Sequence, residues 1–291
     1  MKALIFDCDG VLADTELHGH LVAFNRMWQN AGVPWRWSEE QYAEKLKIGG
    51  GKERMRALFS EPAFQAVYAV PKDEAGQKDV LAQWHAQKTA IYQEIIASGS
   101  VPGRTGVKRL AEEALAAGWF LAVASTSAKP SVEAVLRFTV GDAVASQFKI
   151  FAGDIVPKKK PAPDIYLFAV KELGVPADRC IAIEDSRNGL LAATSAGIRT
   201  VVTTSYFTTG EHFDEAILVL DSLGDPKGKE CTVLANRTGH QIGPFSKPAI
   251  WMPLWANQRI TKLDHAACGR CRPDHYFGSQ FYFATSGTSL P

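Results

Sequence analysis

Residues 3–11 read ALIFDCDGV, an apolar run that ends in two carboxylates with one residue between them. The run from Ala3 to Phe6 has the length and composition of a buried strand. In extended backbone, residues two positions apart share one face. Asp7 and Asp9 leave the strand at its end, so their carboxylates can converge on one point. We therefore expect the chain to begin with a buried strand that has an acidic end.

A repeated alternation of helices and strands follows Gly103. Hydrophobic spacing predicts helices near residues 107–117, 131–137, 163–173 and 189–196. It predicts strands at residues 120–124, 148–151, 180–183, 200–203 and 217–220. Alternating units of this kind form a mostly parallel sheet with helices on both faces. The predicted fold class is therefore α/β, with a Rossmann-like parallel sheet.

The segment between the first strand and this alternation is predicted to be helical. From Glu16 to about Ser98, apolar residues recur at helical spacing and no clear strand occurs. One long helix is expected to include Val80 and Ile96, and Ser38 with Gln41 three residues later fits a capping box. An insertion directly after a central strand lies above the crevice where such sheets bind ligands. The segment is therefore predicted to be a helical cap.

These patterns divide the chain into core (1–14), cap (15–98), continued core (99–225) and a C-terminal extension (226–291) without assigned structure. Residues 248–291 mix aromatic residues with Gly, Ser and Arg and show no periodicity. They are either a peripheral extension or sequence not selected for this fold, such as an altered reading frame. Cys268, Cys271, His265 and His275 are zinc-ligand residue types, but a structural zinc site needs four converging ligands. Zinc is not expected.

The composition is that of a globular protein: 46% of the 291 residues are hydrophobic and 22% are charged. A net charge of +1 gives no electrostatic basis for binding nucleic acid or an anionic membrane. No signal-peptide core and no apolar run of about 18 residues is found, so no membrane association is expected. We expect a cytoplasmic, monomeric enzyme.

A second acidic pair, Glu184-Asp185, follows the predicted strand at residues 180–183. Both pairs would lie at the carboxyl ends of strands, where the ligand crevice is expected. Several carboxylates brought together repel one another unless a cation is present. Mg²⁺ prefers carboxylate, phosphate and water oxygens. The two pairs therefore predict a magnesium site, with helix capping by each pair as the alternative.

Two further segments could bind phosphate. Ser125 and Thr126 end the predicted strand at residues 120–124, where a hydroxyl and free backbone amides can hold phosphate oxygens. Lys160 stands before Pro161 in a rigid turn and could neutralise the charge of a phosphate or a nucleophile. Each signal is weak alone, because such residues are common in turns and on surfaces.

Taken together, these residues resemble the four motifs of the haloacid dehalogenase superfamily, over about residues 1–225. The resemblance implies that Asp7 is the nucleophile and Asp9 the general acid and base. It implies that Ser125 and the Thr126 backbone bind the transferring phosphoryl group and that Lys160 orients it. It further implies that Mg²⁺ is held by Asp7, the Asp9 carbonyl and Asp185, with Glu184 nearby.

The predicted cap resembles that of the CbbY group within this superfamily. The segments that carry the resemblance are 14–16, 19–20, 23–25, 50–54, His85-x-x-Lys88 and 102–104. The resemblance implies hydrolysis of xylulose 1,5-bisphosphate to xylulose 5-phosphate, a sugar of the Calvin cycle. A bisphosphate needs a second anion site, and arginine suits one through bidentate hydrogen bonding. The candidate cations are Lys52, Arg54, Lys88 and Arg104, and Glu16 and His20 could bind sugar hydroxyls or position water.

Two other functions remain open from the sequence. A sugar phosphomutase of the β-phosphoglucomutase type would use the same aspartate pair, although Glu16 follows the phosphatase pattern of the CbbY group. A non-catalytic phosphate-binding regulator on the same fold would be expected to have lost Asp7, Asp9 or Lys160, and all three are present.

Overall fold

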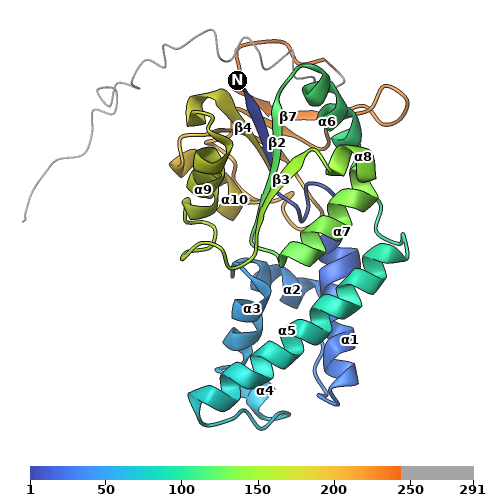
Figure 1. Ribbon diagram of the computed structural model, residues 1–291. Coiled ribbons are helices and arrows are strands. Elements are labelled where there is room, and N and C mark those ends of the chain that lie inside the picture. Colours follow the sequence, from blue (N-terminus) through green and yellow to red (C-terminus); the bar gives the residue numbers. More distant parts are fainter. Residues whose placement is uncertain (244–291) are drawn as a thin grey trace, which may run out of the picture. The chain divides into compact units, whose positions relative to one another are not determined.

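The computed structural model describes residues 1–243, and its central element is a seven-stranded sheet in the order β3-β2-β1-β4-β5-β6-β7 (Figure 1). The strands from β3 to β6 along this order run parallel, and β7 pairs antiparallel with β6. The strand bounds are β1 Ala3–Phe6, β2 Phe120–Ser125, β3 Phe148–Ala152, β4 Cys180–Glu184, β5 Arg199–Thr203, β6 Leu218–Leu220 and β7 Val233–Asn236. The predicted α/β class is confirmed.

Alternate residues of the central strand β1 face two different hydrophobic clusters. Ala3 and Ile5 pack into the cluster that includes residues of helix α9 (Asp164–Leu173) and α10 (Arg187–Ser195). Leu4 and Phe6 pack into the cluster that includes α6 (Val107–Ala116) and α7 (Lys129–Val140). Because both faces are covered, the strand is apolar throughout, as expected for a parallel sheet. Helix α8 (Asp142–Ala145) follows α7.

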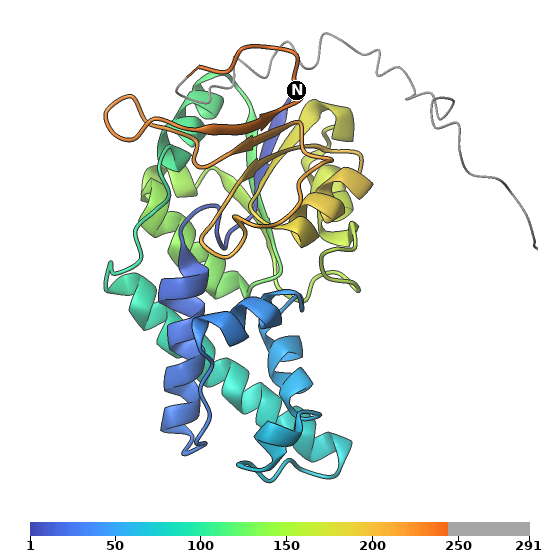
Figure 2. The same ribbon diagram turned by 180° about the vertical axis from the view of Figure 1, so that it is seen from behind.

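The predicted cap is a separate group of helices beyond the carboxyl end of β1 (Figures 1 and 2). It begins with a π-helix, η1 (Glu16–Leu21), which continues into α1 (Val22–Asn30). The remaining cap helices are α2 (Glu39–Leu46), α3 (Gly51–Leu58), α4 (Pro62–Gln65) and the long α5 (Glu74–Ala97). The predicted capping box at Ser38 and the predicted long helix are confirmed.

An aromatic cluster forms the interior of the cap. The rings of Trp28 and Trp37 lie 4.6 Å apart at 89°, and Phe24 contacts both of them. Tyr42 on α2 packs beside Trp37 and is fully buried. Such edge-to-face contacts add to the hydrophobic gain from burying the rings. These buried rings belong to the same hydrophobic cluster as Leu4 and Phe6 of β1, so the cap can hold side chains in fixed positions above the sheet.

The two linkers between core and cap lie against each other. Ala13 in the first linker forms an antiparallel bridge with Gly103 in the second. The backbone N–H of Arg104 donates to the carbonyl of Leu12 at 2.9 Å. The cap is thus joined to the sheet by a paired connection next to the end of β1.

The edge strand β7 lies in the segment that the sequence left unassigned, and its pairing with β6 adds residues 233–236 to the sheet. A short 3₁₀ turn, η2 (Ala177–Arg179), precedes β4. The aromatic-rich stretch 248–291 and its cysteine pair lie outside the described residues. Within residues 1–243, no helix has both the length and the apolar character needed to cross a membrane.

Candidate active site

The register of the sheet brings the predicted motifs together at the carboxyl ends of neighbouring strands. Phe6 at the end of β1 pairs with Val123 of β2 on one side and with Ile183 of β4 on the other. The backbone N–H of Asp7 donates to the carbonyl of Ile183 at 2.9 Å, which extends the ladder by one residue. Asp7, Ser125 and Glu184 therefore emerge side by side, although they are far apart in the sequence.

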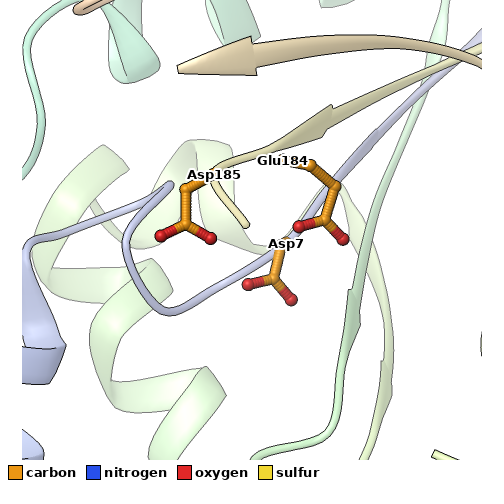
Figure 3. Close-up of side chains that lie close together, drawn as sticks. All are labelled: Asp7, Glu184 and Asp185. Atoms are coloured by element: carbon orange, nitrogen blue, oxygen red, sulfur yellow. The ribbon is translucent and has the colours of Figure 1, made fainter. Parts of the chain in front are cut away.

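Asp7, Glu184 and Asp185 form a buried carboxylate cluster (Figure 3). One oxygen from each lies within 4.8 Å of the others. Burial, with the charges of Glu184 and Asp9, raises the pKa of Asp7 to about 7, although Lys160 opposes the shift. Burial and the charges of Asp7 and Glu184 also raise the pKa of Asp185, against a hydrogen bond from Ser205 and the Arg104 charge.

The cluster fits a divalent cation. Its donors are all carboxylate oxygens, which Mg²⁺ prefers. The Oε2 atom of Glu184 is buried and has no hydrogen-bond partner among the described residues. A cation nearby would relieve both the repulsion of the carboxylates and the cost of this orphaned oxygen.

Lys160 links the nucleophile position to the cluster. Its Nζ donates to Asp7 Oδ1 at 2.6 Å, to Glu184 Oε1 at 2.7 Å and to the Ala124 carbonyl at 2.8 Å. Burial disfavours the lysine charge, but Asp7 and Glu184 outweigh this and raise the pKa of Lys160. Tyr166 on α9 donates to the same Glu184 oxygen at 2.5 Å. Lys160 is therefore a fixed cation beside Asp7.

Asp9 accepts hydrogen bonds from both core and cap. Thr15 Oγ1 and His20 Nε2 lie 2.6 and 2.8 Å from its Oδ1, and the Ser127 hydroxyl donates to Oδ2. Burial would raise the pKa of Asp9, but the His20 charge and these hydrogen bonds outweigh it and lower the pKa. The structure thus holds Asp9 as a carboxylate, the form that can accept a proton.

A cavity of about 400 Å³ opens over these groups and is walled by core and cap together. Ten of the residues that the sequence predicts for the site line it: Asp7, Asp9, Glu16, His20, Arg54, Lys88, Ser125, Thr126, Lys160 and Asp185. Glu184 is fully buried behind the cavity wall. The predicted core residues are therefore brought together around one space.

Two cap side chains in this cavity are already held by neighbours. Glu16 Oε2 accepts a hydrogen bond from the Tyr42 hydroxyl at 2.5 Å and lies 3.5 Å from Arg54 Nη1. His20 Nδ1 lies 2.5 Å from Nζ of Lys88, whose pKa is lowered to about 8 by burial. Glu16 and His20 thus have fixed orientations on the cavity wall.

A second cavity of about 300 Å³ adjoins the first, since both are lined by His20, Lys88, Thr126 and Ser127. Its wall is rich in cations: Lys52, Lys88, Lys129 and Lys159. Lys52 reaches Asp154 at 2.9 Å, and Lys159 reaches Glu53 at the same distance. These ion pairs join α3 of the cap to the loop after β3. The predicted residue Lys52 is therefore placed in the second cavity, not the first.

Arg104 is not brought to either cavity. Its Nη2 donates to the carbonyls of Thr204 and Asp221, at 2.7 and 2.8 Å. It lines a different hollow, formed with Lys108 and Lys229. The expectation that Arg104 binds a substrate phosphate is therefore corrected: its guanidinium is used on backbone carbonyls.

Several residues around the site are given no individual role by the sequence, although Gly10 and Thr15 lie in motif segments quoted above. They are Gly10, Thr15, Tyr42, Tyr92, Ser127, Tyr166 and Ser205. Ser127 stands one residue beyond the predicted phosphate-binding pair, and its hydroxyl donates to Asp9. Gly10 has φ +78°, and a Cβ there would lie 2.0 Å from Asp185 Oδ2. Tyr42, Tyr92, Tyr166 and Ser205 carry no local signal, because each acts through a contact made only in the folded chain. Tyr92, for example, stacks on His20 with ring centroids 4.1 Å apart.

The class of enzyme follows from the family to which the sequence matches. A family model described as haloacid dehalogenase-like hydrolase matches residues 1–197. The chain belongs to the haloacid dehalogenase-like hydrolase family, in agreement with the resemblance of its motifs.

Within that family the similarity is to CbbY proteins. The chain is 45% identical over 225 residues to a CBBY-like protein of Arabidopsis thaliana, covering 77% of this chain and 70% of the relative. The crystal structure of CbbY from Rhodobacter sphaeroides in complex with phosphate is 40% identical, with a TM-score of 0.68, over 76% of this chain and 94% of that chain. A mutant of the same protein in complex with xylulose-(1,5)bisphosphate matches over the same shares, at 40% identity, with a TM-score of 0.67. The chain is accordingly an enzyme, a CbbY-like phosphoric monoester hydrolase.

Proposed function

We propose that this enzyme is a magnesium-dependent phosphatase that hydrolyses xylulose 1,5-bisphosphate to xylulose 5-phosphate through a phosphoryl group carried on Asp7. The observation that supports this most strongly is the position of Asp7. It lies against the fixed cation Lys160 at 2.6 Å, beside two further carboxylates, and on the wall of the cavity. A carboxylate held in this way can attack phosphorus once its charge is balanced.

The chemistry divides into two displacements. In the first, a carboxylate oxygen of Asp7 forms a bond to phosphorus while the bond from phosphorus to the sugar oxygen breaks, and Asp9 delivers a proton to that oxygen. In the second, water attacks phosphorus and the bond from phosphorus to Asp7 breaks, so that phosphate is released. Asp9 takes the water proton in this step and delivers it to the sugar oxygen in the next turnover. The hydrogen bonds to Asp9 from Thr15, His20 and Ser127 favour its carboxylate form, so they suit the second step.

Mg²⁺ would be held by Asp7, Asp185 and the Asp9 carbonyl, with Glu184 behind them. When bound, the cation would neutralise charge on the phosphoryl group and on the clustered carboxylates. Lys160 keeps Asp7 oriented by a direct hydrogen bond and by sharing Glu184 with Tyr166. Ser125 and Thr126, on the cavity wall, would bind phosphoryl oxygens.

The second cavity supports a substrate with two phosphates. It adjoins the first at Ser127 and Lys88 and offers four lysines at its wall. Lys52 and Lys88, on the wall of the second cavity, are proposed to bind the second phosphate. Arg54, on the wall of the main cavity, is proposed to bind the substrate from there. A related protein whose structure contains xylulose-(1,5)bisphosphate also favours this substrate. Glu16 and His20 are proposed to contact the sugar or the attacking water between the two sites.

The proposed setting is the Calvin cycle, where xylulose 5-phosphate is used, in a cytoplasmic and monomeric enzyme. The first part of this proposal rests on the similarity to CbbY proteins and on what that resemblance implies. A net charge of +1 is consistent with a small-molecule substrate rather than nucleic acid.

A product assay tests the function directly. The purified chain would be supplied with Mg²⁺ and with xylulose 1,5-bisphosphate, β-glucose 1-phosphate or other sugar monophosphates. Free phosphate and sugar phosphates would then be followed together. We expect stoichiometric phosphate and xylulose 5-phosphate from the bisphosphate. Isomerised sugar phosphate without free phosphate would instead establish a phosphomutase, and no turnover of any sugar phosphate would contradict catalysis.

A further inference from the structure

Ser205 makes a contact that the proposed reaction does not by itself require. It lies two residues beyond β5, is 5% exposed, and donates from Oγ to Asp185 Oδ2 at 2.7 Å. Its own backbone N–H donates to Thr208 Oγ1 at 2.8 Å, which closes the turn. The serine hydroxyl is thus fixed by its loop and directed to one oxygen of a proposed metal ligand.

We infer that Ser205 is a positioning residue, which orients Asp185 so that its other oxygen, Oδ1, faces the cation. This inference rests on the proposed function. Oδ2 of Asp185 is held between the Ser205 hydroxyl and Gly10, where even a methyl group would lie 2.0 Å away. For Oδ1, no hydrogen bond to a described residue is found, so this oxygen is available to a ligand. Partners of this kind commonly set the orientation of metal-binding carboxylates.

Arg104 supports the same arrangement from the far side of the loop. Its Nη2 donates to the carbonyl of Thr204, the residue before Ser205, and to the carbonyl of Asp221. Its backbone N–H donates to Leu12, in the loop that follows Asp7 and Asp9. One residue therefore ties the loop that carries Ser205 to the loop that carries the nucleophile. This gives Arg104 a structural role in place of phosphate binding.

The competing explanation is that the Ser205 hydroxyl only stabilises its own turn, since Thr208 Oγ1 lies 3.1 Å from it. The two explanations differ in their dependence on the metal. Loss of a turn contact lowers stability whether or not Mg²⁺ is present. Loss of an orienting contact weakens Mg²⁺ binding and is offset by more Mg²⁺.

The test compares Ser205→Ala with Ser222→Ala in the full chain. Ser222 is equally buried at 5%, and its hydroxyl bonds Asp221, not Asp185. Mg²⁺ binding would be measured by isothermal titration calorimetry, and kcat as a function of Mg²⁺ concentration. We expect Ser205→Ala to weaken Mg²⁺ binding about 10-fold or more, with kcat recovering at saturating Mg²⁺, and Ser222→Ala to bind like the wild type. Should Ser205→Ala fail to fold, Ser205→Cys keeps the volume and is expected to show the same weakening.

Equal Mg²⁺ affinity in the Ser205 variant and the wild type would overturn this inference and leave the proposed metal site intact. A kcat loss in Ser205→Ala that persists at saturating Mg²⁺ would also overturn it. Failure of the wild type itself to bind Mg²⁺ would overturn the proposed metal site and this inference together.

Discussion

Lys160 Nζ and Asp7 Oδ1 lie 2.6 Å apart, although 153 positions separate the two residues in the sequence. Lys160 lies between β3 and α9, and β2 separates β3 from β1 in the sheet. The lysine side chain therefore reaches across the end of β2 to Asp7, which follows β1. The same lysine also contacts Glu184 of β4 and the Ala124 carbonyl of β2. One side chain thus joins three adjacent strand ends at the point where chemistry is proposed.

Replacing this lysine by methionine is expected to lower both the turnover rate and the stability of the fold. Lys160→Met should lower kcat by roughly 10²- to 10³-fold, because the fixed charge at the reacting group is lost. It should also destabilise the fold by about 3–5 kcal/mol, since Asp7 and Glu184 would keep buried charges without their partner. Phosphate release and urea unfolding measure the two effects. Lys158→Met, at an exposed neighbouring position, is the control and should change neither.

Gly10 is expected to tolerate no side chain, because its missing Cβ leaves the space that Asp185 occupies. In Gly10→Ala, the new methyl group would displace Asp185 Oδ2, which lies 2.0 Å from its position. We expect a loss of roughly 10- to 100-fold in Mg²⁺ affinity.

Gly32→Ala is the matched control for this substitution. Gly32 also has positive φ, +67°, but no atom lies within 4 Å of an added Cβ. Both variants place a side chain at positive φ, so a comparable loss of Mg²⁺ affinity in the two would show that backbone strain, not Asp185, is responsible.

The raised pKa of Asp7 predicts how stability depends on pH in metal-free protein. Its pKa is about 7 in the folded chain, mainly through burial, and about 4 when unfolded. A group with the higher pKa in the folded state binds its proton more tightly there, so its stabilisation is present below pH 4 and lost as pH rises through 7. With chelator present, the free energy of unfolding should fall between about pH 4 and pH 7 and level off above that.

Asp7→Asn is expected to make that profile shallower, because the amide does not titrate and the raised pKa of Asp185 remains. Mg²⁺ should restore stability to the wild type above pH 7, since the cation favours the carboxylate. Urea titrations at several pH values, with chelator and with Mg²⁺, give the comparison. An unchanged pH profile in the variant would show that another group is responsible.

The second cavity predicts a selective effect of Lys52. Lys52→Ala should raise KM for a sugar bisphosphate by roughly 10-fold, because a charge-assisted contact to the distal phosphate is lost. It should leave KM for the corresponding sugar 1-phosphate nearly unchanged. Lys78→Ala, at an exposed position on α5, serves as control. Equal increases in KM for both substrates would place Lys52 outside phosphate recognition.

The sheet and the core motifs could be predicted because parallel strands buried on both faces read as unbroken apolar runs. The acidic residues that follow two such runs then lie together at the carboxyl ends of the strands. Edge strand β7 could not be predicted in this way. Three of its four residues are exposed, so it shows neither an apolar run nor a buried face.

Contacts made across the fold were also beyond the sequence. The neighbours of Arg104 are carbonyls 100 and 117 positions away, so its motif gave no indication of where its guanidinium would point. In the sequence, Tyr42 and Ser205 look like ordinary helix and loop residues. Their roles depend on the residues that they contact in the folded chain. The cap helices were predicted from periodicity, but the π-helix at Glu16–Leu21 was not, because apolar spacing does not distinguish it from an α-helix over so few residues.

The central claim is that Asp7 carries the phosphoryl group, and trapping that intermediate tests it most directly. The Mg²⁺-loaded enzyme would be mixed with xylulose 1,5-bisphosphate and quenched in acid within milliseconds. Its peptides would then be analysed by mass spectrometry, alongside those of Asp7→Asn. We predict one phosphoryl group on the peptide that contains Asp7, appearing before free phosphate accumulates and absent from the variant. A phosphoryl group on another residue, or steady turnover by Asp7→Asn, would contradict the account.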